Sequence, residues 1–526
     1  MKNPIAKPRD PSSFAIVEPR IENLAREIAR LLSLVEFEKE GQPVEVDGFR
    51  LRDLSQWRDH QALSALDAVL FISGVCNSHC AFCFEHGVPF ARETSFMSEE
   101  EVRTRLRHYS PETGVGLFAS NRPQMETFLH PKAVEVLEAA RQRDKESLFC
   151  VTTNGSLLDE ATVERIARLQ PLIIKFSLNV ADEKLHRELM GLGARTRTSL
   201  AVPPLLRKHR IPFIGGIVAW PTIPFPAIEE TVRTLEENEA YAIRIRLPLS
   251  HKYLRDQPNV DWDRHWARVT EFARTLRCRV PLYVEPVQYS TTPIVPRIDG
   301  VILRSPADRA GVHTGDVVEA INGEGILTRN ESYAILQRCH DSSCSVELLV
   351  SRQGQKLQFH LEPQAEATYP YDPKLSFRGQ AYGIFHVDDF RLQHLVDVFG
   401  MIERYGAKRT LLFTSPLVAP TFELLTRSIP EFAEVRKKVT LYVDTVPESS
   451  LGGNYALLDS QFVADIAGAI RRRLESDPDV DLILIPNAFG SVWGIDLYGE
   501  SYSRLGLEFG IPVELIDWHF PYGRDI

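Results

Sequence analysis

Hydrophobic and polar positions along the chain follow two different periods. Short apolar runs of the kind that form buried strands alternate with segments whose apolar residues recur every third or fourth position, which predicts helices. The runs lie at 68–73, 115–120, 148–153, 172–178, 211–220 and 242–247, with helical patterns between most of them, for example over 133–142 and 159–169. This alternation predicts parallel strands joined by right-handed crossovers, in an open α/β sheet or a full or partial parallel β/α barrel.

The segments on either side of this region carry other patterns. Apolar residues at helical spacing predict a helix over 21–35, and alternating residues predict a hairpin over 44–51 that turns at Asp47-Gly48. The sequence VELLVSRQGQKLQFHL predicts a second hairpin, and the C-terminal part has strand-like runs at 410–415, 439–444, 481–486 and 513–517. We therefore divide the chain into an N-terminal arm, helix and hairpin cap (1–62), a partial barrel (63–290), a small mainly-β domain (291–365) and a C-terminal α/β domain (366–526).

Composition narrows the class of protein. The 526 residues are too many for one core, and 44% hydrophobic with 25% charged residues is typical of a soluble globular chain. The 61 lysines and arginines against 71 acidic residues give a net charge of −10, which argues against a general nucleic-acid binder. We find no apolar stretch long enough to span a membrane and no secretory signal, so we expect a cytoplasmic protein.

Three of the seven cysteines carry the strongest chemical signal. Cys76, Cys80 and Cys83 stand in C-x3-C-x2-C spacing directly after the first predicted strand. Three soft thiolates on one loop can hold three irons of a [4Fe–4S] cluster and leave the fourth iron open to a small molecule. A zinc site is the alternative; it would need a fourth ligand, His79 or His86, and would give a colourless protein.

The other four cysteines are scattered, so we expect one cluster and no auxiliary one; they are Cys150, Cys278, Cys339 and Cys344. Of these, Cys150 lies inside a predicted strand and is expected to be a small core residue.

The region 68–250 resembles the radical S-adenosylmethionine (SAM) enzymes. The cysteine motif, with the aromatic Phe82 just before its third cysteine, is similar to the cluster loop of that superfamily. The resemblance implies that Cys76, Cys80 and Cys83 are the metal ligands and that Phe82 lies against the adenine of SAM. A second motif, QMETFLHP (124–131), is similar to the Gly-Gly-Glu-Pro segment of many members, with Gln-Met in place of the two glycines. It implies that Gln124 and Glu126 accept hydrogen bonds from the SAM amino group.

Two further motifs stand at predicted strand ends. VTTNG (151–155) and KFSLN (175–179) imply cofactor contacts from Thr153 and Asn154 and from Ser177 and Asn179. In a third strand, AIRIRL, the alternating arginines share one strand face; they are Arg244 and Arg246. Either of the two could bind the SAM carboxylate, and a surface-facing basic pair is the alternative.

Residues 300–323 resemble a bacterial-type PDZ domain. The segments SPADRAG, TGD and ING follow one another in the order of that domain. PDZ domains capture an extended peptide by adding it to a sheet edge as a strand. The resemblance thus implies a peptide or protein partner at this domain, and a structural role that braces the barrel or covers its mouth is the alternative.

Together the resemblances imply a radical SAM enzyme with a PDZ domain. One [4Fe–4S] cluster and SAM would be the cofactors, and an electron donor such as flavodoxin or ferredoxin would drive reductive cleavage of SAM. The resulting 5′-deoxyadenosyl radical would abstract hydrogen from a small-molecule or peptide substrate, in an oxidoreductase or transferase reaction. The alternative function is an iron–sulfur sensor or scaffold that recruits a partner through the PDZ-like domain without turning over SAM.

Overall fold

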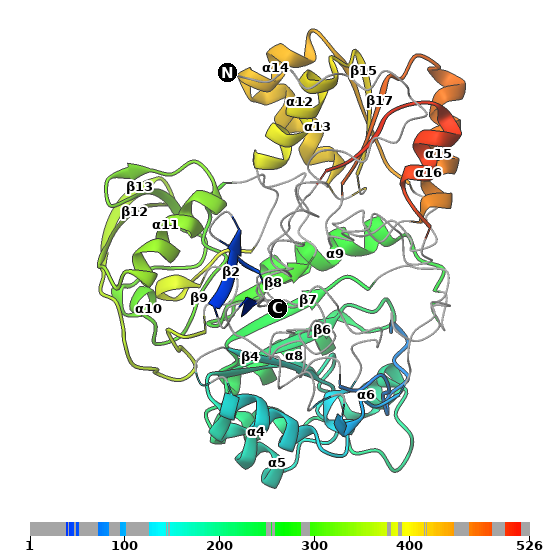
Figure 1. Cartoon of the computed structure of the whole chain (residues 1–526). Coiled ribbons are helices and arrows are strands. Elements are labelled where there is room, and N and C mark those ends of the chain that lie inside the picture. Colours follow the sequence, from blue (N-terminus) through cyan, green and yellow to red (C-terminus); the bar gives the residue numbers. More distant parts are fainter. Residues whose placement is uncertain are drawn as a thin grey trace.

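The computed structural model (Figure 1) describes most of the chain from residue 72 onward. The described residues are 38–39, 42–46, 49–51, 72–83, 95–100, 102, 126–143, 145, 148–248, 254, 258–285, 295–375, 380–387, 392–414, 416, 418–446, 462–486 and 500–516. The predicted helix over 21–35 and the predicted strand over 115–120 lie outside them.

The central sheet has five parallel strands in the order β4-β5-β6-β7-β8. They are β4 (Phe149–Thr153), β5 (Leu172–Ser177), β6 (Phe213–Val218), β7 (Ala242–Arg246) and β8 (Leu282–Glu285). Each strand lies beside its successor in the chain, so every crossover steps in the same direction, as in a β/α barrel. This row of strands with its helices is called the barrel unit (126–285) below.

Helices connect these strands and begin at conventional signals. They are η3 (Thr127–Leu129), α4 (Ala133–Arg143), α5 (Glu160–Ile166), η4 (Ala167–Leu169), α6 (Glu183–Met190), α7 (Val202–Lys208), α8 (Phe225–Glu237) and α9 (Trp262–Thr275). Asp159, Asp182 and Asp261 precede α5, α6 and α9, and each carboxylate accepts a hydrogen bond from a backbone N–H in the first turn. Such N-caps satisfy donors that the helix itself cannot pair.

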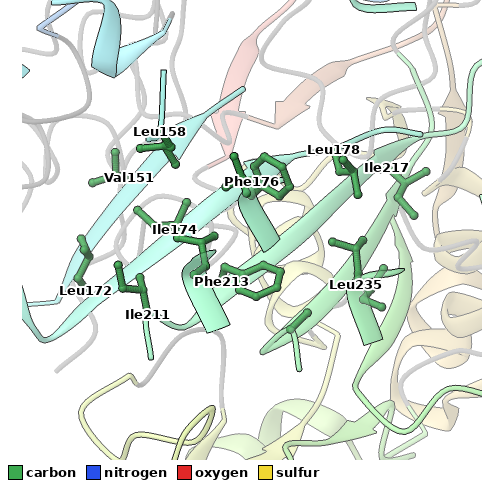
Figure 2. Close-up of a cluster of buried hydrophobic side chains, with 14 of the residues drawn as sticks. Val151, Leu158, Leu172, Ile174, Phe176, Leu178, Ile211, Phe213, Ile217 and Leu235 are labelled. Carbon is green, nitrogen blue, oxygen red and sulfur yellow. The ribbon is translucent and has the colours of Figure 1, made fainter. Parts of the chain in front are cut away.

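The central sheet packs against other elements on both of its faces. Successive residues of a strand point to opposite faces, and each of the two sets belongs to a buried core. Val151, Ile174 and Phe213 pack with Leu235 of α8 in the larger core (Figure 2). The residues beside them in the strands belong to a second core; they are Cys150, Ile173 and Ile214. Burial on both faces explains why these strands appear in the sequence as continuous apolar runs.

The second core closes the N-terminal end of the barrel unit with residues from much later in the chain. Tyr371, Leu375 and Phe385 pack there, and the Tyr241 hydroxyl donates to the Leu375 carbonyl oxygen at 3.1 Å. An ion pair of 2.6 Å between Arg304 and Glu239 lies on the same side of the molecule. The opposite end, where the strands terminate, is where β/α barrels carry their functional residues.

The predicted strands of this region are confirmed from 148 onward, with two differences nearer the ends. Of the run at 68–73, only residues 72 and 73 are described, and Ser73 forms just an isolated bridge with Phe96. Strand β8 was not predicted, since its four residues form too short a run beside an expected linker. The predicted hairpin near the N-terminus is present as β2 (Gln42–Val46) and β3 (Phe49–Leu51), with β1 (Glu38–Lys39) beside β2.

A small, mainly antiparallel unit follows, called the small β unit (295–387). Its four-stranded sheet has the order β11-β10-β12-β13. Its elements are β9 (Gly300–Val301), α10 (Pro306–Ala310), β10 (Val317–Ile321), β11 (Glu324–Gly325), α11 (Arg329–Asp341), β12 (Val346–Arg352), β13 (Gln355–Leu361), η5 (Ala381–Gly383) and β14 (Ile384–Phe385). The predicted hairpin is confirmed as β12 and β13, and a capping box of Thr328 and Glu331 begins α11.

Strand β14 closes the edge of β9, although it lies beyond the predicted end of this domain at residue 365. The two strands pair antiparallel, with Ile384 opposite Val301. The Tyr382 hydroxyl reaches the carbonyl oxygen of Cys344 just past α11, and His386 Nε2 lies 2.9 Å from the Ser332 hydroxyl on α11. Residues 381–387 are therefore packed between β9 and α11.

The C-terminal unit (392–516) is a second parallel α/β fold and stands at the top of Figure 1. Its strands have the order β16-β15-β17-β18. The elements are α12 (Leu392–Tyr405), β15 (Arg409–Phe413), α13 (Ala419–Ser428), α14 (Pro430–Arg436), β16 (Thr440–Asp444), α15 (Val463–Ser476), β17 (Leu482–Pro486), α16 (Ser503–Phe509) and β18 (Val513–Ile516). Helices α12 to α14 cover one face, and α15 and α16 cover the other.

The predicted fold class is confirmed: a parallel α/β sheet, a small mainly-β domain and a C-terminal α/β domain follow one another. Among the described residues, no helix combines the length and apolarity that a membrane span requires.

Glu514 on β18 makes the stability of the C-terminal unit depend on pH. Its carboxyl group is fully buried against the Tyr405 hydroxyl, and burial raises its pKa from 4.5 to about 8. The folded chain thus keeps a proton that the unfolded chain releases, so the free energy of unfolding falls between about pH 4.5 and pH 8 and levels off above. We expect Glu514→Gln to raise the melting temperature slightly at about pH 5 and most above about pH 8, since each pKa unit is worth about 1.4 kcal/mol.

Scanning calorimetry of both proteins across this pH range measures the difference. Glu475→Gln, at an exposed position of α15, is the matched control and should show no pH-dependent gain. A gain from Glu514→Gln that is the same at every pH would contradict the buried titration.

Candidate functional site

The three motif cysteines lie together on one loop, residues 72–83, called the cysteine loop. Cys76, Cys80 and Cys83 are each half-buried thiols. The backbone N–H groups of His79 and Ala81 donate to the last carbonyls of α6, each at 3.0 Å. The loop is therefore fixed on the C-terminal end of α6.

Gly191 makes this attachment possible. It ends α6 in the left-handed conformation with φ of 57°. A Cβ at this position would lie 2.3 Å from the carbonyl oxygen of His79, closer than real Cβ atoms come. Only glycine allows the end of α6 and the cysteine loop to approach this closely.

Asn154, directly after β4, holds the loop from the other side. Its Nδ2 donates to Asn77 Oδ1 at 2.9 Å and to the Ser78 hydroxyl at 3.0 Å, and it lies 3.7 Å from Cys76 Sγ. Asn77 Nδ2 in turn donates to the Ser156 hydroxyl at 2.8 Å. The sequence prediction missed Asn77, Ser78 and Ser156; the only signal for them is that they are polar residues beside motif positions.

Glu126 connects the end of β4 to the cysteine loop. Its buried carboxylate accepts from the Thr153 hydroxyl and the Asn154 N–H, each at 2.7 Å, and from the Phe128 N–H at 3.2 Å. Its own N–H donates to the Val75 carbonyl oxygen in the cysteine loop. Burial raises the pKa of Glu126 even though these three hydrogen bonds act in the opposite direction. A carboxylate has about four acceptor positions, so one remains for a further donor.

The chemistry of the cysteine loop fits an iron–sulfur cluster. Burial raises the pKa of the Cys76 thiol, and the negative charge of Glu126 adds to this, while hydrogen bonds from Ser78 and Asn154 to the sulfur lower it. Donors of this kind are what tune cluster sulfurs in iron–sulfur proteins. No group of three His, Cys, Asp or Glu side chains that could hold one metal ion occurs within the described ranges.

Phe82 belongs to the cysteine loop, and the end of β5 is the next element that carries predicted site residues. The Phe82 ring is part-buried against the core, 6.4 Å from the ring of Trp220. Asn179, which is buried with φ of 62°, accepts from the Val218 N–H at 3.0 Å and has its Nδ2 at 3.0 Å from the Met190 sulfur. Both ends of its amide thus join β5, β6 and α6. Ser177 is half-buried at the last position of β5.

The two arginines of β7 share one acidic partner. Arg244 and Arg246 lie 3.4 Å and 3.7 Å from the carboxylate of Glu285 on β8, which is itself 8% exposed. The Arg244 side chain is 16% exposed and that of Arg246 is 49% exposed, so one arginine is largely buried beside Glu285 and the other faces solvent. Sequence reasoning missed Glu285 because it missed β8.

The structure thus joins some of the predicted site residues by direct hydrogen bonds and leaves others only nearby in the fold. Thr153, Asn154 and Glu126 are bonded into one network with the cysteine loop. Ser177 on β5 and the two arginines on β7 lie toward the same end of the sheet, with β6 between the two strands; the arginines are Arg244 and Arg246. Gln124 lies outside the described residues.

Comparison with known families agrees with this geometry. Residues 70–235 match the model of the radical SAM superfamily. This part of the chain is a radical SAM domain. Residues 297–350 match the model of the PDZ domain, as the sequence predicted. The expected cofactors, one [4Fe–4S] cluster and SAM, are those of the superfamily.

Solved structures resemble the chain only in part. SuiB of Streptococcus suis bound to S-adenosylmethionine matches with a TM-score of 0.34 and 19% identity, over 45% of this chain and 55% of SuiB. The PDZ domain of EpsC from Vibrio cholerae matches with a TM-score of 0.09 and 24% identity, over 10% of this chain and 62% of that domain. This chain therefore spans about half the length of SuiB. No curated protein matches it.

The contact at Gly191 gives a test of the cysteine loop. We expect Gly191→Ala to lower the melting temperature, because a left-handed alanine costs about 1–2 kcal/mol and its Cβ would press on the His79 carbonyl. The displaced loop should also hold less iron after anaerobic reconstitution, measured as iron per chain.

Gly193→Ala is the matched control two residues away. Its Cβ would come no closer than 3.6 Å to any neighbour, and its φ is not positive. Equal iron content in Gly191→Ala and the wild type would show that the cysteine loop does not depend on this contact.

Proposed function

We propose that the chain is a radical SAM enzyme. Cys76, Cys80 and Cys83 would hold one [4Fe–4S] cluster, and SAM would bind at the adjoining strand ends. The observation that carries the proposal is the hydrogen-bonded network of the cysteine loop, Asn154 and Glu126, inside the stretch that matches the superfamily. When bound, cluster and SAM supply one-electron cleavage of SAM and hydrogen-atom abstraction from a substrate.

The chain's own residues would orient the cofactor. Phe82, beside Trp220, offers an aromatic face for the adenine. The remaining acceptor position of Glu126 suits the SAM ammonium group, and Gln124 is proposed for the same group. Thr153 and Asn154 contribute by fixing Glu126 relative to the loop.

The neighbouring strands would supply the rest of the SAM site. Arg244 and Arg246 lie side by side on β7 next to Glu285, and their guanidinium groups are the donors that suit the SAM carboxylate. Ser177 is proposed to reach the ribose. Asn179 is proposed to act there too, with its amide held by Val218 and Met190.

The substrate is proposed to be a small molecule or a peptide, and the electron donor a flavodoxin or ferredoxin. The second core fills the N-terminal end of the barrel unit, so substrate would enter at the opposite end, where the strands have their C-terminal residues. The fate of the substrate radical decides whether the reaction is that of an oxidoreductase or of a transferase.

The second candidate function is an iron–sulfur sensor that recruits a partner through the PDZ domain. Strand addition requires an open sheet edge. The edge of β9 is already paired with β14, His386 hydrogen-bonds to Ser332 on α11, and the Tyr382 hydroxyl donates to the carbonyl oxygen of Cys344 just past α11. These contacts favour the structural role, in which the PDZ domain braces the barrel unit.

Anaerobic reconstitution tests the enzyme proposal. With iron, sulfide, dithionite and SAM, we expect the wild type to form 5′-deoxyadenosine, detected by mass spectrometry. Cys80→Ala should lose both the visible absorbance of the cluster and the product, because one iron loses its ligand. Cys344→Ala, an exposed thiol of the PDZ domain, should keep both.

Other outcomes separate the alternatives. A cluster that binds SAM in electron paramagnetic resonance but gives no 5′-deoxyadenosine with any substrate would favour the sensor. Full cluster absorbance in Cys80→Ala would count against the ligand assignment.

A further inference from the structure

A cavity of about 300 Å³ lies between the barrel unit and the PDZ domain, and it is called the seam cavity here. One wall is formed by α9 and β8, and the other by residues 297–299, 314–315 and the first residue of α11. None of its lining residues belongs to the candidate SAM site. Its volume is at the lower end of the range of small-molecule sites.

The charged side chains around the seam cavity are mostly positive. Arg274, Arg297 and Arg329 line it together with a single acidic residue, Asp299, which gives 3 − 1 = +2 in a chain whose net charge is −10. Asp299 lies 3.6 Å from Arg329 and accepts from the Val387 N–H at 2.8 Å. Arg274 and Arg297 are both exposed to solvent at the edge of this lining, and neither forms an ion pair with any described residue. Two guanidinium groups therefore remain for a ligand.

A buried hydroxyl points to the same kind of ligand. Thr270 of α9 lines the seam cavity and is only 5% exposed, and its Oγ1 has no hydrogen-bond partner among the described residues. A threonine inside a helix usually donates to the carbonyl oxygen four residues earlier, and this one does not. An unsatisfied buried hydroxyl is costly, and an acceptor oxygen in the cavity would satisfy it.

We propose that the seam cavity binds a small anion bearing a carboxylate or phosphate group. Arg274 and Arg297 would bind its charge, and the Thr270 hydroxyl would donate to one of its oxygens. The N-terminus of the 13-residue helix α11 adds a favourable dipole at the same wall. Because both domains contribute, the bound anion would stabilise their junction.

Calorimetric titration of the full chain at low salt tests the site with two probes, inorganic phosphate and succinate. We expect saturable binding of at least one, and the one that binds more tightly identifies the acid group. Arg274→Gln with Arg297→Gln should weaken binding by at least about tenfold, because both charges are lost. Arg338→Gln, an exposed arginine of α11 away from the cavity, is the matched control.

Thr270→Val separates ligand binding from folding. Without ligand it should raise the melting temperature, because it removes the unsatisfied hydroxyl while keeping the shape of the side chain. With the same probe it should weaken binding severalfold. No saturable binding of either probe to the wild type, equal weakening by Arg338→Gln, or unchanged affinity in Thr270→Val would each overturn the proposal. SAM cleavage does not enter these measurements, so they stand or fall apart from the enzyme proposal.

Discussion

Burial of the central parallel sheet on both faces is the constraint on which the rest of the chain depends. One face needs the helices of the barrel unit, and the other needs a cover that the barrel unit does not contain. Tyr371, Leu375 and Phe385 supply that cover from far along the chain. The PDZ domain and the segment after it are therefore part of the barrel's packing. With the N-terminal end filled, the ends of the strands become the side where polar residues gather.

The hydrogen bonds between the end of β4 and the cysteine loop fix the three thiols at the end of the sheet where the polar residues lie. A loop that bears three thiols cannot fix its own geometry, because it forms no regular strand or helix. Asn154 holds it from the strand end, Gly191 from the end of α6, and Glu126 joins the strand end to the loop's backbone. The buried carboxylate is satisfied by three protein donors, so its role in holding these parts does not require a cofactor.

The sequence predicted those features of the fold and the site that leave a pattern within a short stretch of residues. Strands buried on both faces appear as apolar runs, and the cysteine spacing identifies the loop. Contacts between residues that are distant in the sequence were not predicted, because no short stretch of sequence carries a signal for them. Glu285 became visible as the partner of Arg244 and Arg246 only once β8 lay beside β7, and β14 only once it paired with β9. Asn77 and Ser78 carry no signal beyond their place between cysteines.

The order of the strands in the two parallel sheets is also a feature that the local sequence pattern does not predict. Both arise from alternating strands and helices, yet the barrel unit adds each strand beside the last, whereas the C-terminal unit starts at β15 and builds outward on both sides. Right-handed crossovers then place helices on both faces of the second sheet, as α13 and α15 show. The sequence period is identical in the two cases. The difference lies in the direction of each crossover, which the spacing of apolar residues does not record.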